Sequence, residues 1–163
     1  MTIYTSFLTT PIGLLKITSS KKEILEILFS DTFTKTSEDS LPDIHLNCIS
    51  QLNRYFSGKL SDFALALKPK GTGFQQKVWQ ALREIPHGRT ISYQDLADRL
   101  GDPKATRAVA AANGKNKIAI IIPCHRVIGS DGTLVGYAGG LHKKEWLLQH
   151  EGAIPQLKMF TGA

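Results

Sequence analysis

The hydrophobic pattern changes character about a third of the way along the chain. In the first 30 residues, short apolar runs rich in β-branched types alternate with turn residues, which predicts three strands, at 3–8, 12–18 and 24–29. The polar stretch 31–42 is expected to be a loop. Apolar side chains at near-helical spacing over 44–57 then predict a helix that ends at Gly58.

Helical patterns dominate after residues 68–73, which have the composition of a linker. Thr72 with Gln75 three residues later is a capping-box signal. The apolar helical stripe behind it stops at Pro86. A last helix is expected over 141–150.

Two short helices are predicted between these. The first is expected to start at Ser92 and stop at Gly101. The second would have Asp102 as its cap, Pro103 at its first position and Asn113-Gly114 at its close. Two short helices joined by a tight glycine-containing turn are typical of a helix-turn-helix, although the spacing alone fits any αα-corner equally well.

The second of these helices is expected to have a nearly bare exposed face. The residues predicted to point inward are Ala105, Ala108, Val109 and Ala112, which leaves Thr106, Arg107, Ala110 and Asn113 outside. A helix that reads the major groove usually carries several long polar side chains. A bare face suits close approach to a narrow groove or to the phosphodiester backbone, with Arg107 inserted into the base stack. The alternative is that Arg107 is an ordinary solvated charge.

The chemical centre is expected at Cys124. The apolar run 118–122 predicts a strand buried on both faces, and Pro123 stiffens the step from that strand to the thiol. A thiol needs a base, and His125 is adjacent. Consecutive residues on a strand point opposite ways, so contact needs a turn or a bridging water. The cysteine of an isolated Cys-His pair is more often a buried structural thiol than a nucleophile. Cys48, on the apolar side of the helix predicted over 44–57, is interpreted as a core residue.

A histidine base usually needs a third group that fixes its tautomer. The candidate is Glu151, directly after the helix expected over 141–150. Sequence spacing does not place Glu151 beside His125.

Composition narrows the class of protein. The chain has 163 residues and a formal charge of +6, which favours a polyanionic partner, nucleic acid first and a membrane surface second. No run of 18 apolar residues and no export signal is apparent, so we expect a cytoplasmic protein that does not enter the membrane. Two cysteines are too few for a disulfide scaffold and are expected to be free thiols.

The segment Pro123 to Gly129 resembles the active-site signature of the 6-O-alkylguanine-DNA alkyltransferases. Four further blocks resemble that family in the same order: Ile91 to Ala97, Thr106 to Asn113, Gly136 to Leu141 and Lys144 to Leu148. The resemblance is strong from about Phe63 to Gly152 and weaker over the first 60 residues.

The resemblance implies roles for the reacting groups. Cys124 would accept the alkyl group irreversibly, once per molecule. His125 would take the thiol proton through a water, and Glu151 would orient His125. Asn116 would hold the turn before the active-site strand. Tyr93 would crowd the target phosphate and donate a hydrogen bond to the base.

The same resemblance implies how lesion and DNA are held. Tyr137, Ala138 and Gly139 would line the guanine pocket. Arg107 would fill the hole left by the flipped nucleotide, from a helix in the minor groove. The other positions that match DNA contacts are Thr106, Ala110, Gln94 and Asn113. Ala138 stands where some relatives carry serine, so one pocket hydrogen bond would come from the backbone.

The implied architecture is α/β (α+β). A small ribonuclease-H-like α/β domain (1–68) would precede a mostly helical domain with a winged-helix-like helix-turn-helix (69–152), followed by a tail (153–163). The partner would be double-stranded DNA containing 6-O-alkylguanine, with 4-O-alkylthymine as a further candidate lesion. We expect no cofactor, no metal, no obligate protein partner and a monomer.

Three other interpretations compete. Alkyltransferase-like proteins bind the same lesion but have tryptophan in place of the cysteine, which Cys124 argues against. A cysteine hydrolase using Cys124, His125 and Glu151 would turn over many times. A transcription factor would not need the thiol.

Overall fold

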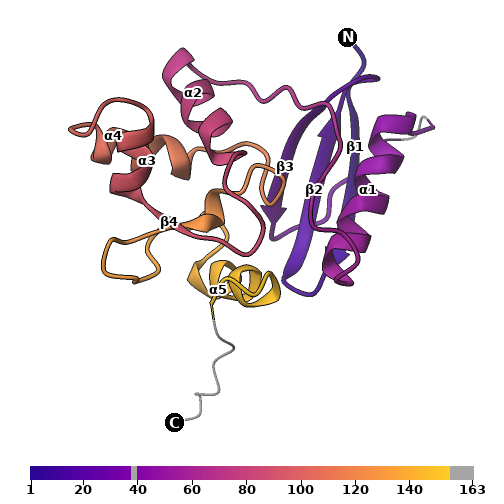
Figure 1. The fold of residues 1–163 in the computed structure, drawn as a ribbon. Helices are drawn as coiled ribbons and strands as arrows, with labels where there is room; N and C mark the ends of the chain where they lie inside the picture. The colour runs from indigo at the N-terminus through magenta and orange to yellow at the C-terminus, as the bar shows by residue number, and fades with distance from the viewer. Residues whose placement is uncertain (38–39, 155–163) are drawn as a thin grey trace.

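The computed structural model describes residues 1–37 and 40–154. Its first half is an antiparallel sheet in the order β1-β2-β3, with one helix packed against it (Figure 1). The elements are β1 (Tyr4–Thr10), β2 (Gly13–Ser19), β3 (Ile24–Ser30) and α1 (Asp43–Phe56). The three predicted strands and the predicted helix are therefore confirmed, each to within two residues at either end.

A buried histidine joins α1 to the sheet. His45 is fully buried, and its two ring nitrogens lie 2.6 Å from the Ser6 hydroxyl on β1 and 2.8 Å from the Ser19 hydroxyl on β2. Side chains alternate across a strand, so the face that carries these serines also carries Ile17 and, on β3, Ile27 and Phe29. Burial lowers the pKa of His45, which favours the neutral ring.

The second half is mostly helical. Its elements are α2 (Gly73–Leu82), β4 (Ile91–Ser92), α3 (Tyr93–Arg99), α4 (Thr106–Gly114), a 3-10 turn (Cys124–Arg126), β5 (Val127–Ile128) and α5 (Leu141–His150). β4 and β5 pair in parallel. Helices α2 and α3 start after Thr72 and Ser92, as predicted. The capping box predicted at Thr72 is present, and Ser92 forms a second one with Asp95.

The predicted start of α4 is wrong. Asp102 does not cap this helix. Its backbone N–H donates to Ala97 O and completes the C-terminal turn of α3, with Gly101 at φ +76°. The Asp102 carbonyl then accepts from Ala105 N in a tight turn that contains Pro103. The first helical residue is Thr106, and its N-cap, Ala105, has no side-chain bond to offer.

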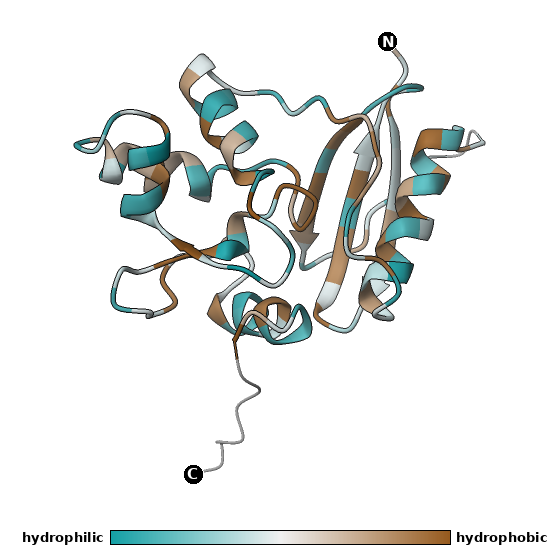
Figure 2. Ribbon diagram, in the orientation of Figure 1, coloured by the Kyte–Doolittle hydropathy of each residue, from teal (hydrophilic) through white to brown (hydrophobic). Residues whose placement is uncertain are grey.

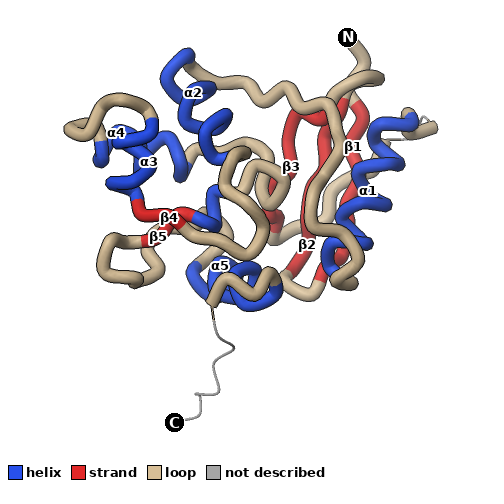
Figure 3. The backbone as a smooth tube through the Cα atoms, viewed as in Figure 1, coloured by secondary structure: helices blue, strands red, loops and turns tan. Residues whose placement is uncertain are grey.

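The predicted strand over 118–122 is also wrong. This segment is a compact turn, drawn as a loop in Figure 3. All five residues are buried, as expected, but Ile121 N donates to Ala119 O and Ile122 N to Ile118 O. Ile120 has φ +72°, a strained conformation for a β-branched residue. Figure 2 shows the stretch as a continuously hydrophobic segment.

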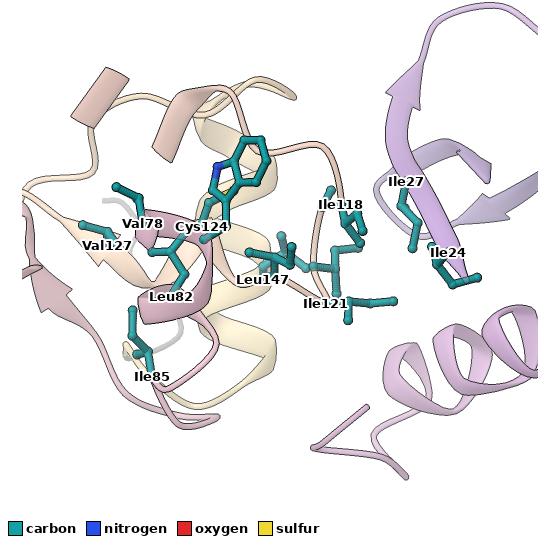
Figure 4. Packing of buried hydrophobic residues seen from close by; sticks show 14 of the residues in the cluster. Ile24, Ile27, Val78, Leu82, Ile85, Ile118, Ile121, Cys124, Val127 and Leu147 are labelled. Carbon is teal, nitrogen blue, oxygen red and sulfur yellow. The ribbon is translucent and has the colours of Figure 1, made fainter. Parts of the chain in front are cut away.

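The turn links the two halves of the molecule. Ile118 forms a parallel bridge with Ile27 of β3, and Ile24 forms another with Leu67. In Figure 4, Ile118 and Ile121 lie between Ile24 and Ile27 on one side and Cys124 and its neighbours on the other. The division of the chain into domains at residues 68 and 69 stays a prediction.

In the described part of the chain, no helix has the length and apolar character needed to cross a bilayer. Residues 155–163, most of the predicted tail, lie outside the described residues.

Candidate active site

Cys124 begins the 3-10 turn that follows the buried 118–122 segment. The residue is only 8% exposed, yet it borders a cavity of about 210 Å³. The other lining residues come from both halves of the chain: Leu28, Phe29, Asn113, Gly114, Asn116, Ala119, Gly136, Tyr137 and Ala138. The thiol therefore borders a small pocket rather than lying on the surface.

The resting state of Cys124 is the protonated thiol. Burial raises its pKa, whereas hydrogen bonding from Asn116 and the charge of Lys144 act in the opposite direction. A thiol held in this state needs a base at the moment of reaction. Cys48, which is fully buried beneath the sheet, has a pKa raised to about 12 by burial and behaves as the core residue predicted.

The structure places Glu151, which the sequence could not place, against the ring of His125. His125 Nε2 lies 2.8 Å from Glu151 Oε2, and both side chains are fully buried. Glu151 is ionised, because its bonds to His125 and Arg126 outweigh burial and hold its pKa well below the usual range. Nε2 therefore carries the hydrogen, and Nδ1, which has no protein hydrogen-bond partner, is the proton acceptor. Burial lowers the pKa of His125, which keeps the ring neutral.

Two partners of Glu151 were not predicted. Arg126 donates from Nε to Oε1 (2.8 Å) and from Nη2 to Oε2 (3.0 Å), while its Nη1 donates to the Ile85 carbonyl (2.7 Å). Tyr55 of α1 donates its hydroxyl to Oε2 at 2.6 Å. Arg126 follows His125 in sequence and was a visible candidate. Tyr55 lies 96 residues from Glu151, and no sequence signal connects them.

Asn116 holds the turn that presents the cysteine. Its Nδ2 donates to the carbonyls of Ile118 (3.2 Å) and Ile122 (2.8 Å), and its Oδ1 accepts from Ile118 N (3.0 Å). This one amide ties both ends of the strained turn together. The position agrees with the role implied by the resemblance, although what it supports is a turn and not a strand.

Tyr93 lies at the edge of this site rather than in the wall of the cavity. Its hydroxyl donates to the Val135 carbonyl (2.9 Å) and accepts from Lys144 Nζ (3.5 Å). Lys144, unpredicted and fully buried, also donates to the carbonyls of Val127, Val135 and Gly136. It thereby ties β5 to the loop that ends at Tyr137, and burial lowers its pKa to about 8.

Of the three residues expected to line a guanine pocket, two border the cavity next to Cys124. Tyr137 and Ala138 line the cavity, and Gly136 lines it in addition. Gly139 does not; it packs against Phe29. Two buried polar atoms of lining residues, Tyr137 Oη and Asn113 Oδ1, have no hydrogen-bond partner among the described protein groups. A base with donor and acceptor edges would complement such atoms.

The helix-turn-helix is formed by α3 and α4. Arg107 is exposed on α4. Gln94 and Thr106 bond to each other (Thr106 Oγ1 to Gln94 Oε1, 2.9 Å), and Gln94 Nε2 donates to Pro103 O. These two residues thus join the helices, and Ala110 beside them is half-buried.

The predicted exposed face of α4 is wrong at two positions. Asn113 is buried and Ala108 is exposed. Asn113 follows Val109 by four residues and therefore shares its inward face. Its Nδ2 donates to the Cys124 carbonyl at 3.4 Å, which places Asn113 at the cavity rather than on the exposed face of α4.

Within the described residues, no group of three or more histidine, cysteine, aspartate or glutamate side chains is arranged to hold a metal ion.

The fold and the site together define a class: an α/β protein with a helix-turn-helix and a buried cysteine that borders a small pocket. The family model for the DNA-binding domain of 6-O-methylguanine DNA methyltransferase matches residues 73–153, and that for its ribonuclease-like domain matches residues 3–69. The chain belongs to this family.

Two curated relatives carry the name methylated-DNA–protein-cysteine methyltransferase. That of Methanosarcina barkeri is 61% identical over 101 residues, which cover 62% of this chain and just under two thirds (64%) of the relative. That of Mycobacterium tuberculosis is 48% identical over 128 residues, covering 78% of this chain and 76% of the relative.

Solved structures agree along nearly the whole chain. The crystal structure of M. tuberculosis O6-methylguanine methyltransferase has a TM-score of 0.83 at 40% identity, covering 98% of this chain and 99% of that one. The same organism's protein in complex with DNA has a TM-score of 0.82 at 43% identity, covering 90% and 91%.

Proposed function

We propose that this protein repairs DNA by transferring the alkyl group of 6-O-alkylguanine to its own Cys124. The observation that carries the proposal is the buried thiol at a small cavity, beside a histidine whose acceptor nitrogen is free and whose tautomer is fixed by Glu151. The family and the mycobacterial relative solved with DNA support the same conclusion.

The chemistry follows from these groups. A lesion within duplex DNA must leave the base stack to reach a buried thiol. The thiol proton passes to His125 Nδ1 through a water, Sγ bonds to the alkyl carbon, and the bond from carbon to O6 breaks. The guanine anion that leaves takes up one proton and His125 returns to its neutral form, so the S–H and C–O bonds are exchanged for an S–C bond and an N–H bond of neutral guanine. Tyr93 would donate to the leaving base in place of the Val135 carbonyl.

The product explains why one molecule acts once. A thioether is not hydrolysed under mild conditions, so the acceptor is not regenerated. A cysteine hydrolase, by contrast, needs a labile thioester and access for water. A cysteine that is only 8% exposed, in a protein with a helix-turn-helix, suits alkyl transfer from DNA better than repeated hydrolysis. We further propose that the protein acts as a cytoplasmic monomer without an obligate protein partner.

Label transfer tests this function. The protein is incubated with duplex DNA carrying 6-O-[methyl-³H]guanine, and label bound to protein is counted. We expect about one label per molecule, located on Cys124 by peptide mass spectrometry, and none in Cys124→Ala. Cys48→Ala is the matched control and should keep full stoichiometry. Release of labelled methanol with repeated turnover, or binding without transfer, would contradict the proposal.

Arg107 provides a second test. The side chain is exposed on α4, and we propose that it occupies the gap left by the flipped nucleotide. Flipping a nucleotide costs a few kcal/mol, and Arg107 would offset part of this cost. Arg107→Ala is therefore expected to slow methyl transfer from duplex DNA by about tenfold to 100-fold. Transfer from the free base 6-O-benzylguanine, which needs no flipping, should be unchanged. Equal slowing with both substrates would rule out this role.

A further inference from the structure

Part of the cavity wall comes from the N-terminal half of the chain. Leu28 and Phe29, at the end of β3, line the same cavity as Cys124. The bridge between Ile27 of β3 and Ile118, with backbone bonds from Ile27 N to Lys117 O and from Ala119 N to Ile27 O, holds this end of the sheet against the turn that presents the cysteine. The wall is therefore a fixed part of the site.

The ring of Phe29 is held from three sides. Its centroid lies 5.9 Å from that of Tyr137 in an edge-on contact, and Lys143 Nζ lies 4.5 Å above its face. Gly139 packs so closely that a Cβ there would come within 2.8 Å of the ring. The ring cannot move toward Tyr137 or Gly139, so it cannot yield easily to a large ligand.

The remaining walls give little room for adjustment. The cavity, at about 210 Å³, is below the roughly 300–1,000 Å³ of ordinary small-molecule sites. Asn116 and Cys124 are fixed by the turn, and Ala119 and Ala138 are too small to gain space by rotating. Apart from Tyr137, Phe29 is the largest side chain in the wall.

From this arrangement we propose that Phe29 determines which alkyl groups the protein accepts, favouring methyl and other small groups over bulky ones such as benzyl. The inference rests on the proposed function. It assigns to the N-terminal half a direct part in substrate selection. Steric discrimination in an apolar pocket amounts to about 10-fold to 200-fold per methylene-sized change.

The test compares two duplexes that differ only in carrying 6-O-methylguanine or 6-O-benzylguanine. Second-order rate constants for alkylation of Cys124 are measured by intact-protein mass spectrometry. We expect Phe29→Ala to raise the benzyl-to-methyl ratio by about tenfold or more, and Phe29→Leu to raise it less. Phe33→Ala is the matched control, because Phe33 is 68% exposed and contacts Phe7 outside the cavity.

The outcomes separate the two proposals. A ratio in Phe29→Ala that is unchanged or lower, or an equal rise in Phe33→Ala, would overturn the role of Phe29 while leaving alkyl transfer intact. If Phe29→Ala does not fold, a ratio in Phe29→Leu that stays at the unsubstituted value overturns it in the same way. No transfer from either duplex by the unsubstituted protein would overturn the proposed function itself.

Discussion

Replacing Arg126 with methionine is expected to lower the free energy of unfolding by about 3–5 kcal/mol at pH 7. Arg126 is the only cation that bonds directly to the Glu151 carboxylate in the described part of the chain, through both oxygens. Methionine fills similar space but leaves a buried charge without its ion pair, and leaves the Ile85 carbonyl without a donor. Chemical denaturation at equilibrium measures the loss.

The effect of Arg126→Met should depend on pH. In the unsubstituted protein the pKa of Glu151 is depressed on folding, so this carboxylate contributes stability above its unfolded pKa, near 4.5, and loses it as pH falls toward the folded pKa. The variant has less of this stability to lose. The difference in the free energy of unfolding between the two proteins should therefore narrow below pH 4.5.

The control is Arg99→Met, at an exposed position. Its free energy of unfolding should stay within about 0.5 kcal/mol of that of the unsubstituted protein. A loss below 1 kcal/mol in Arg126→Met would show that the pair is not needed for stability.

Elements governed by local rules were predictable from the sequence. The strands of the first sheet follow from short apolar runs with turn residues between them. The starts of α2 and α3 follow from capping boxes at Thr72 and Ser92, which act within four residues. Asp102 looked like a third cap, but α4 begins four residues later, at Thr106, so Asp102 is too early in the chain to stand at its N-cap, and its backbone completes the C-terminal turn of α3.

The segment 118–122 shows where pattern alone fails. A continuous apolar run is consistent with any fully buried conformation, and periodicity cannot separate a strand from a buried turn. What decides here is Asn116, whose side chain bonds to both ends of the run and stabilises the left-handed conformation of Ile120. The turn matters for function. Consecutive residues on a strand point to opposite faces, whereas a turn allows the adjacent Cys124 and His125 to belong to one site.

The candidate site was predictable as a set of residues but not as an arrangement. The sequence pattern made Cys124, His125 and Glu151 candidates, the resemblance to the family joined them in one site, and the structure brings the last two into contact. Tyr55 and Phe29 reach the same centre from the N-terminal half through tertiary packing. Contacts of this kind join residues about 100 positions apart, so local sequence carries no trace of them.

Replacing His125 with glutamine is expected to slow alkyl transfer by about 10²-fold to 10⁴-fold at pH 7, the usual contribution of a positioned general base. Burial raises the pKa of the Cys124 thiol, so without His125 the thiolate forms only by direct titration. The logarithm of the rate constant in His125→Gln should therefore rise with a slope near 1 between pH 7 and 9.

The unsubstituted protein should behave differently over the same range. Burial lowers the pKa of His125 below 6.5, so the ring is already neutral at pH 7 and the rate should be nearly flat up to pH 9, falling only in acid. His142→Gln, at an exposed position, should retain the flat profile. Transfer in His125→Gln within threefold of the original rate, or with a flat profile, would mean that the thiol loses its proton to another group. The pH profile thus separates a base that removes the thiol proton from a ring that only supports the buried Glu151 carboxylate.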